Sequence, residues 1–375
     1  MKVVNLTNPT MRHIKKQMTS RERVLLAFDH RQPDRVPAWC GASPEFREIA
    51  RRRLRLADDE ELSLYLGDDF RRVYARYAGP DERSPTSCFI HPEAASRTPF
   101  GVERHGYGYG QPLHHPLAHA RTAADINQYS WPDPGWMDVS HIRPDALQWK
   151  GEFAILGGDW SPFFHDAIDL LGMEYFMLLL YESPEAVDTL LGHIVDYYWE
   201  VSRYIFEAAR GAIDIFFIGN DFGTQAGPVV GEGMFRRFFL PHLQRLVDLG
   251  HAFGLKVMLH CCGGFAPLIP AMIEIGLDGL QSLQPSARDM EPVRLKRDFG
   301  DKIVLNGCID THHLLIKSTP DLVRQKTRET LEVMKPGGGY IASPSHDYLL
   351  PETPVENVLA MYETVRAFGG YEKEA

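Results

Sequence analysis

Two kinds of metal-binding residue stand together in the segment KVMLHCC, residues 256–262. Only 5 cysteines occur among the 375 residues, and two of them, Cys261 and Cys262, directly follow His260. Side chains alternate between the faces of a strand, so His260 and Cys262 are expected on one face and Cys261 on the other. An imidazole and a thiolate on one face are suitable zinc ligands. The pair predicts a zinc site; the competing interpretation is a hydrogen-bonded histidine beside two cysteines that fill the core.

A catalytic zinc site has three protein ligands and one open position. The chain offers two candidates for the third ligand, and both stand at the end of an expected strand. His346 follows a strand expected at 340–345, and Cys308 ends a strand expected at 302–308. We predict His346 as the third ligand, with Cys308 as the alternative.

Asp221 is the first candidate for acid–base chemistry. It follows the apolar segment at 212–219, where a low dielectric is expected to raise the pKa of a carboxyl group. Asn220 and His346 are the other catalytic candidates. The competing interpretation of Asp221 is a carboxylate that caps a turn or a helix. Three more polar residues at strand ends are candidates for substrate binding: Asp159, Gln281 and Gln284.

From residue 151 onward, apolar strands alternate with amphipathic helices, which predicts a parallel sheet covered on both faces. The expected strands are 152–158, 212–219, 256–262, 278–284, 302–308 and 340–345. Two more, near 34–39 and 71–77, complete the eight strands of a (β/α)8 TIM barrel. An open doubly wound sheet is the alternative, but no glycine-rich phosphate loop follows a strand. Barrel active sites lie at the C-terminal ends of the strands, where the candidate residues stand.

We expect a single domain over residues 1–375, with an N-terminal elaboration and the first strands in 1–150 and regular β/α units in 151–375. Thr19 and Glu22 have the spacing of a capping box at the start of a helix over 19–30. Residues 44–56 predict a second, basic helix, and residues 97–116 predict a β-hairpin with a long connection. Pro241 is expected to kink or split the helix that contains it.

Composition narrows the range of partners and compartments. The net charge is −10 and no long basic run occurs, so a nucleic-acid surface is not expected. No apolar run approaches the roughly 18 residues of a membrane span, and residues 1–17 lack the pattern of a signal peptide. The cysteines are odd in number and lack disulfide-framework spacing, which predicts reduced thiols. A cytoplasmic protein is therefore expected.

The sequence resembles the uroporphyrinogen decarboxylase superfamily over nearly its whole length. Four segments carry the resemblance: TSRERVLLAFDHRQPDRVPAW (19–39), FFIGNDFGTQAGPVV (216–230), GLKVMLHCCGGFAPLIPAMIEIGLDGLQSLQ (254–284) and GGGYIASPSHDYLLPETPVENVLAMYETV (337–365). The resemblance implies a (β/α)8 barrel with an active-site cleft at its mouth, in agreement with the strand count.

Two branches of this superfamily differ at identifiable positions. True decarboxylases carry an arginine-bearing motif after the first Pro-Val-Trp-like segment, and the corresponding RVPAWCGASPEF (35–46) has no arginine cluster in phase. The other branch contains zinc methyltransferases that serve corrinoid proteins and bind zinc through a His-x-Cys pair and a later Cys. His260 and Cys262 match the pair, whereas the third position falls near SPSH (343–346), which offers His346 and no Cys.

The second branch implies a methyltransferase that moves a methyl group between a small methyl donor or thiol acceptor and a corrinoid protein. Zinc would activate the thiol as a thiolate, which takes the methyl group from methylcobalamin. Cobalamin would be carried by a separate partner that docks over the barrel mouth, and a second copy of the chain is another candidate partner. Two alternatives remain. One is a metal-free decarboxylase of a tetrapyrrole or another carboxylated substrate, with Asp221 and His346 handling protons. The other is a non-catalytic barrel that binds a corrinoid or tetrapyrrole.

Overall fold

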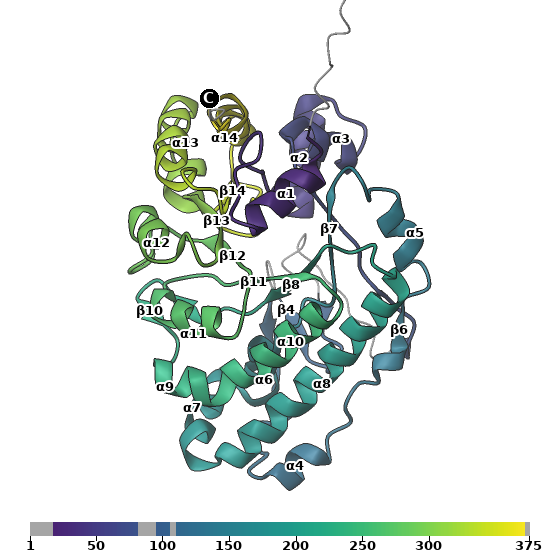
Figure 1. The fold of residues 1–375 in the computed structure, drawn as a ribbon. Coiled ribbons are helices and arrows are strands. Elements are labelled where there is room, and N and C mark those ends of the chain that lie inside the picture. The colour runs from purple at the N-terminus through teal and green to yellow at the C-terminus, as the bar shows by residue number, and fades with distance from the viewer. Residues whose placement is uncertain (1–17, 82–94, 106–109, 372–375) are drawn as a thin grey trace, which may run out of the picture.

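The central sheet of the computed structural model contains seven parallel strands that curl around a common interior (Figure 1). The structure describes residues 18–81, 95–105 and 110–371. The strand order is β1-β7-β8-β11-β12-β13-β14. Their bounds are β1 (Phe70–Arg72), β7 (Ala154–Gly157), β8 (Ile215–Gly219), β11 (Lys256–His260), β12 (Gly279–Leu283), β13 (Val304–Ile309) and β14 (Tyr340–Pro344). All six strands predicted after residue 151 are confirmed.

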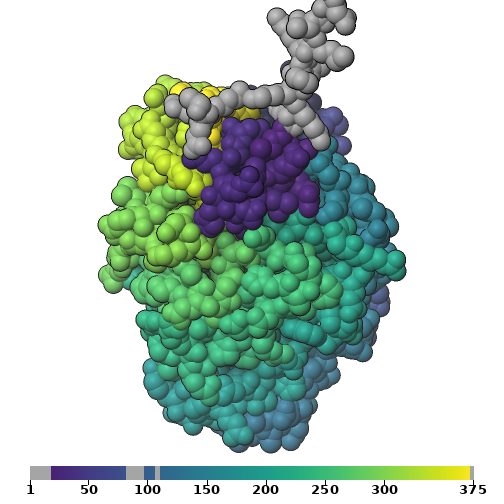
Figure 2. Space-filling view, viewed as in Figure 1, coloured from purple at the N-terminus to yellow at the C-terminus, as the bar shows by residue number. Residues whose placement is uncertain are grey.

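A short extended segment closes the barrel between the first and last strands of this order. The backbone N–H of Trp39 donates to the carbonyl of Ala342 in β14 at 3.0 Å, and that of Ala342 donates to the carbonyl of Pro37 at 2.9 Å. On the opposite side, the N–H of Asp69, just before β1, donates to the carbonyl of Ala38 at 3.0 Å. Figure 2 shows the N-terminal part of the chain in purple beside the C-terminal part in yellow. The segment predicted as a strand at 34–39 therefore completes the TIM-type barrel.

The other early strand is shorter than predicted. Instead of one strand over 71–77, β1 ends at Arg72, and a separate strand β2 (Arg76–Tyr77) pairs antiparallel with β6 (Met137–Asp138). The chain thus leaves the barrel after three residues and pairs with the elaboration outside it.

The helices lie outside the sheet, except α1. They are α1 (Ser20–Phe28), α2 (Pro44–Leu54), α3 (Asp59–Leu66), α4 (Ala123–Asn127), α5 (Ile142–Leu147), α6 (Phe163–Leu171), α7 (Met173–Glu182), α8 (Pro184–Ala209), α9 (Glu232–Met234), α10 (Leu240–Ala252), α11 (Ile269–Glu274), α12 (Pro292–Phe299), α13 (Pro320–Met334) and α14 (Val355–Phe368). Short 3-10 or π turns are η2 (Pro134–Trp136), η3 (Phe235–Phe239), η4 (Ala266–Leu268) and η5 (Thr311–Leu315). None of the helices in the described part of the chain combines the length and apolar character that a membrane crossing requires.

Two local predictions about helices are confirmed. The side chain of Thr19 accepts from the N–H of Glu22, whose carboxylate accepts in return from the N–H of Thr19 at 2.8 Å, so the capping box is formed. The π turn η3 ends two residues before Pro241, which is the helix break expected there, because proline cannot donate a backbone hydrogen bond.

The predicted hairpin region forms a small three-stranded antiparallel sheet. Its strands are β3 (Ala95–Arg97), β4 (Glu103–His105) and β5 (Gln111–Pro112), in that order. Residues 106–109 of the predicted connection lie outside the described residues, as do residues 1–17, which bear on the absence of a signal peptide. A further two-stranded ribbon, β9 (Gly223–Thr224) with β10 (Gly227–Pro228), follows β8.

Helix α1 closes the N-terminal end of the barrel interior. Its buried residues Val24, Ala27 and Phe28 pack with inward-facing side chains of the strands. These are Phe70, Ala154, Leu156, Ile215, Phe217, Met258, Val304 and Ile341, together with Trp39. Burial of each large side chain contributes about 1.5–3 kcal/mol. This end of the barrel is a dry core, which leaves the C-terminal end for chemistry.

Aspartates repeat at the N-terminal ends of the strands. Asp69, Asp214 and Asp278 each directly precede a strand. Each carboxylate accepts a backbone N–H from the adjacent strand or extended segment: Ala38 at 2.8 Å, Ile155 at 3.0 Å and Val257 at 2.8 Å. These three hydrogen bonds join neighbouring strands at the end of the barrel opposite the candidate site.

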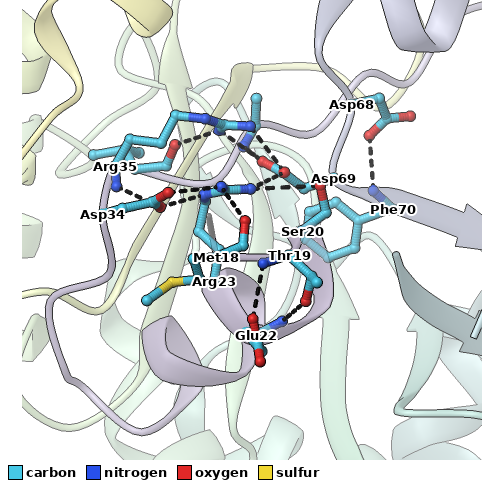
Figure 3. A network of polar contacts seen from close by, with 12 residues as sticks. Met18, Thr19, Ser20, Glu22, Arg23, Asp34, Arg35, Asp68, Asp69 and Phe70 are labelled. Atoms are coloured by element: carbon cyan, nitrogen blue, oxygen red, sulfur yellow. Dashed lines mark hydrogen bonds and ion pairs between the residues drawn. The ribbon is translucent and has the colours of Figure 1, made fainter. Parts of the chain in front are cut away.

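The most buried of these aspartates is the centre of a charged network (Figure 3). The side chain of Asp69 is fully buried and accepts from Arg23 of α1 at 2.7 Å and from Arg35 at 2.8 Å. Arg23 also pairs with Asp34 at 2.6 Å. Because three sequence-distant segments meet at one carboxylate, the network holds α1 and the closing segment against β1.

Candidate metal and active site

Asp221, His260 and Cys262 converge at the C-terminal end of β8 and β11. The Nε2 atom of His260 lies 3.3 Å from Sγ of Cys262 and 3.4 Å from Oδ1 of Asp221. All three ligand atoms lie within 4.8 Å of one another. The two strands pair in parallel with His260 opposite Gly219, which places the residues after each strand side by side. The predicted orientation of His260 and Cys262 toward a common point is confirmed.

The donor set fits a zinc ion. Bonds of about 2.0–2.3 Å at tetrahedral angles put ligand atoms roughly 3.3–3.7 Å apart. The two separations measured from His260 Nε2, 3.3 Å and 3.4 Å, fall at that spacing. Nitrogen, sulfur and carboxylate oxygen are the three donor types that zinc accepts from proteins. Three ligands leave a fourth position open.

A second layer of hydrogen bonds fixes the ring of His260. Its Nδ1 atom donates to Oε1 of Gln281 in β12 at 2.5 Å, and Nε2 of Gln281 donates to Oδ1 of Asp347 at 3.2 Å. Gln281 is fully buried. With Nδ1 bonded to Gln281, Nε2 is the ring atom directed at Asp221 and Cys262, the atom that would bind a metal there.

Cys262 is held by its backbone and by a strained neighbour. Its N–H donates to Oδ1 of Asp221 at 2.7 Å, and its Sγ lies 3.6 Å from the hydroxyl of Ser282. Ser282 has a φ of 74°, an unfavourable value for serine, at an irregularity where β12 pairs with β13. Its hydroxyl also donates to the carbonyl of Ser345 at 3.1 Å. The irregularity turns the Ser282 hydroxyl toward the thiol.

The electrostatics of Asp221 differ from the prediction. Burial by itself would raise the pKa of Asp221, but hydrogen bonds from His165 and His260 and their charges outweigh it and hold the pKa well below its ordinary value. Conversely, burial would lower the pKa of His260, while the adjacent Cys262 and Asp221 raise it well above its ordinary value. The expected raised pKa of Asp221 was wrong because two imidazoles face the carboxylate. The Asp221 carboxylate and the His260 imidazole thus stabilise each other's charged form.

A cavity of about 340 Å³ opens above these residues. Trp160 lines it, with its ring centroid 5.2 Å from that of His260, and His165 lines it, with Nε2 3.4 Å from Oδ2 of Asp221. The other lining residues are Arg104, Gly110, Gln111, Pro112, Pro162, Ile168, Asp169, Gly219, Asp221, His260, Cys262, His346 and Asp347. The fourth position of a metal held by the three ligands would therefore face an accessible space.

The two residues proposed as third metal ligand lie in different places. His346 lines the cavity, but it is not part of the cluster of ligand atoms. Its Nδ1 contacts the backbone of Tyr348, 2.9 Å from the carbonyl oxygen and 3.2 Å from the nitrogen. Cys308 is buried and lines a separate cavity with Leu314 and Val333. The structure brings Asp221 to the pair in their stead.

Two of the remaining predicted residues, Asn220 and Asp159, hold the backbone next to the site. Asn220 is fully buried, and its side chain accepts from the N–H of Phe164 at 2.9 Å and donates to the carbonyl of Ser161 at 3.0 Å. It therefore fixes the start of α6 and does not line the cavity. Asp159 accepts from the N–H of Ser161 at 3.3 Å, which is the contact of a turn carboxylate.

Gln284 lies in the wall of a neighbouring cavity. Its Oε1 accepts from the N–H of Gly263 at 3.1 Å and from Nε2 of Gln225 at 3.0 Å. It lines a neighbouring cavity of about 490 Å³, which meets the first at His346. Its predicted contact with substrate is therefore compatible with its place and stays a prediction.

Sequence reasoning missed Trp160, His165 and Ser282. The first two lie in the segment WSPFFH after β7, at a strand end, so their position was the available signal. Ser282 was missed because strict alternation from Gln281 puts it on the outer face, and the irregularity in β12 reverses that direction.

Fold and site together define a TIM-type α/β barrel with a candidate metal centre at its mouth. The chain belongs to the uroporphyrinogen decarboxylase (URO-D) family, whose model matches residues 114–368, more than half of the chain.

Individual relatives are distant. A uroporphyrinogen decarboxylase from Rickettsia africae (strain ESF-5) is 26% identical over 191 residues, which are 50% of this chain and 51% of the relative. One from Coxiella burnetii (strain Dugway 5J108-111) is 24% identical over 197 residues, 51% of this chain and 50% of the relative. The match thus spans about half the length of these curated relatives. A methyltransferase from Methanosarcina mazei shares the fold, with a TM-score of 0.66, 18% identity, and coverage of 94% of this chain and 99% of that chain.

Proposed function

We propose that this protein is a zinc-dependent methyltransferase that moves a methyl group between a small methyl donor or thiol acceptor and a corrinoid protein. The observation that carries the proposal is the convergence of Asp221, His260 and Cys262 at the mouth of the barrel. A decarboxylase that uses no metal has no need of a soft thiolate beside an imidazole and a carboxylate. The fold shared with the methyltransferase from Methanosarcina mazei supports the same class.

Each residue of the site has a role in this proposal. His260, Cys262 and Asp221 hold zinc, and Gln281 keeps Nε2 of His260 directed at it. Zinc held by these residues would lower the pKa of a thiol substrate. His165 lies 3.4 Å from Asp221 on the cavity side and is placed to receive the thiol proton.

The chemical step itself is a displacement. The thiol gives its proton to a base such as His165, and its sulfur forms a bond to the methyl carbon. The carbon–cobalt bond of methylcobalamin breaks, and cobalt keeps the electron pair. With a methyl ether or methylamine as donor, reduced cobalt would form the bond to the methyl carbon while the carbon–oxygen or carbon–nitrogen bond breaks. The leaving oxygen or nitrogen would keep that electron pair and take up a proton. The corrinoid would be carried by a separate protein that docks over the mouth. The proposal places the protein in the cytoplasm, where the Cys262 thiol stays reduced.

Metal stoichiometry tests this proposal first. Purified protein is expected to hold one zinc per chain, and His260→Ala and Cys262→Ser are expected to lose it. Cys261→Ala is the matched control, because this neighbouring thiol is buried on the other side, where it accepts from the N–H of Phe222 at 3.3 Å. Absence of zinc from the wild-type protein, or its retention in His260→Ala, would contradict the proposal.

Methyl transfer is the second measurement. Zinc-loaded protein is expected to accelerate demethylation of methylcobalamin by 2-mercaptoethanol, followed by the change in the cobalamin spectrum. The acceleration should disappear in His260→Ala and persist in Cys261→Ala. Tight binding of cobalamin with no turnover would instead favour a non-catalytic barrel.

A metal-independent decarboxylase is the second candidate, and the family match and the curated relatives favour it. It predicts release of carbon dioxide from uroporphyrinogen by protein stripped of metal with a chelator. Loss of that release in Asp221→Asn, with wild-type rates in His260→Ala, would establish it over the methyltransferase.

A further inference from the structure

Arg72 is a charged residue at the end of β1, and its guanidinium lies among aromatic rings at the barrel mouth. Its guanidinium carbon lies 4.7 Å from the ring centroid of Tyr74, 5.0 Å from that of Phe217 and 5.3 Å from that of Trp160. Phe217 belongs to the inward-facing core. Arg72 is therefore the inward-facing residue two positions after Phe70, at the level where the barrel opens.

The guanidinium of Arg72 lacks the partners that such a group ordinarily has. Its Nε is buried and makes no hydrogen bond, and Arg72 forms no ion pair within 4.0 Å among the residues that the structure describes. A guanidinium offers five N–H donors. Aromatic faces stabilise its charge in part but accept none of those hydrogen bonds in the way a carboxylate does. The unused donors are a site for an anionic ligand.

Other arginines near the mouth are already engaged. Arg71, the next residue toward the N-terminus, pairs with Glu60 at 2.6 Å, and Arg104 pairs with Asp169. Arg47 lines the same cavity as Arg72 and donates from Nε to the carbonyl of Ala42 at 3.3 Å. The acidic residues of that cavity are Asp59, Glu60, Asp68 and Asp347, of which Asp59 pairs with Arg51 and Glu60 with Arg71. Arg72 thus differs from its neighbours by its free donors, not by its type.

Arg72 lies close to the candidate metal centre. Trp160 packs against Arg72 on one side and lies 5.2 Å, between ring centroids, from His260 on the other. The cavity lined by Arg72, of about 290 Å³, and the cavity above the metal ligands, of about 340 Å³, share Asp347 in their walls. The two cavities are therefore neighbours at Asp347, and Trp160 lies between Arg72 and His260.

We propose that Arg72 binds an anionic oxygen group of the substrate, a carboxylate or a comparable oxyanion, while the other end of the substrate lies at the metal centre. The inference rests on the proposed methyltransferase function and names its substrate class. The substrate is a small molecule with a methyl group or thiol at one end and an oxyanion at the other. Its body is flat and apolar, because the aromatic rings of Tyr74 and Trp160 line the two cavities, Tyr74 that of Arg72 and Trp160 that of the metal ligands. A guanidinium binds such a group through two parallel hydrogen bonds.

A pair of matched probes tests this inference by calorimetry on the full chain loaded with zinc. The probes are 4-methoxybenzoate, which carries a carboxylate, and 4-methoxybenzyl alcohol, its neutral analogue. Wild-type protein is expected to bind the carboxylate at least tenfold more tightly than the alcohol. Arg72→Met is expected to abolish this preference, and Arg72→Lys to retain only part of it.

The control is Arg328→Met, because Arg328 also stacks on an aromatic ring, Phe368 at 4.8 Å, but is exposed on α13. It should leave the preference unchanged. Zinc content and circular dichroism should match the wild type in all variants. A wild-type protein with no preference for the carboxylate, whether both probes bind or neither does, overturns the inference, as does an unchanged preference in Arg72→Met.

Failure of the anion site and failure of the methyltransferase proposal give different results in these experiments. If wild-type protein holds no zinc but still prefers the carboxylate through Arg72, the methyltransferase proposal fails while the anion site stands. If zinc and methyl transfer are present but Arg72→Met behaves as wild type, the anion site fails alone.

Discussion

The imidazole of His260 and the side-chain amide of Gln281 are joined by a hydrogen bond of 2.5 Å between Nδ1 and Oε1. The two residues sit opposite each other on paired strands, β11 and β12. Because the strands fix both backbones, this bond fixes the tautomer and the ring plane of His260. The orientation of the imidazole in the candidate metal centre is therefore set by a residue that is not among the three ligand candidates.

Replacing Gln281 with Ala should weaken zinc binding about 10–100-fold, because the ring of His260 loses its second-layer partner. Competition with a chromogenic chelator measures this affinity. Gln244→Ala, on the surface of α10, is the control and should bind zinc as the wild type does. Unchanged affinity in Gln281→Ala would show that packing alone orients the imidazole.

Two variants distinguish Asp221 from His346 as the third zinc ligand. Asp221→Ala should lose zinc at least as completely as Cys262→Ser, because its carboxylate lies among the ligand atoms. His346→Ala should keep zinc, since His346 lies in the cavity wall and its Nδ1 is engaged with Tyr348. Elemental analysis of both variants decides between them. Zinc lost from His346→Ala and kept in Asp221→Ala would restore the ligand set expected from the sequence.

Asp69→Asn should destabilise the fold by about 3–5 kcal/mol, because it leaves the buried guanidinium of Arg23 with one partner fewer. Chemical denaturation measures the free energy of unfolding. Glu332→Gln breaks an exposed ion pair with Arg328 and is expected to produce no measurable change. Equal stabilities of the two variants would contradict a structural role for the network in Figure 3.

The stability of Asp68→Asn relative to the wild type should rise with pH. Burial raises the pKa of Asp68 from 3.8 to about 7, despite the opposing charge of Arg71. Between these two pKa values the unfolded chain has lost the proton while the folded chain keeps it, so the wild type loses stability as pH rises from about 4 to 7. The relative gain of the variant is at most about 4 kcal/mol, from 1.36 kcal/mol per pKa unit. Denaturation at pH 4 and pH 7.5 measures it; a difference independent of pH would show that Asp68 ionises normally.

Gly219→Ala should lower both stability and zinc affinity. A Cβ atom there would lie 2.0 Å from the indole of Trp160, which must then move away from its position against His260. Gly192→Ala in α8 is the control, because open space surrounds that position and alanine favours a helix. Thermal unfolding and the chelator assay measure both effects. A wild-type zinc affinity in Gly219→Ala would mean that Trp160 does not support the metal site.

The barrel and the His260–Cys262 pair could be predicted from the sequence because both depend on local regularities. Apolar runs with glycine and proline between them mark the strands, and alternation along one strand orients the pair. The role of Asp221 depends on the pairing of β8 with β11, which no spacing along the chain records. The direction of the Ser282 hydroxyl depends on an irregularity in β12. The donors of Arg72 are free because neighbouring arginines pair with the acidic side chains close by. These properties arise from contacts between distant segments, so they became visible only in three dimensions.

The seam between residues 37–39 and β14 also constrains the order of events during synthesis. Ala38 in the closing segment pairs with Ala342 in β14, about 300 residues later in the chain. Translation must therefore be nearly complete before the barrel can close. Until then, β1 and the most recently made strand each present an unpaired edge, which is prone to intermolecular pairing. Helix α1 can occupy the floor of the unfinished sheet from the start, since its apolar residues pack on β1, β7 and β8 as soon as these emerge. The helix that closes this end of the finished barrel is thus present before the last strand is made.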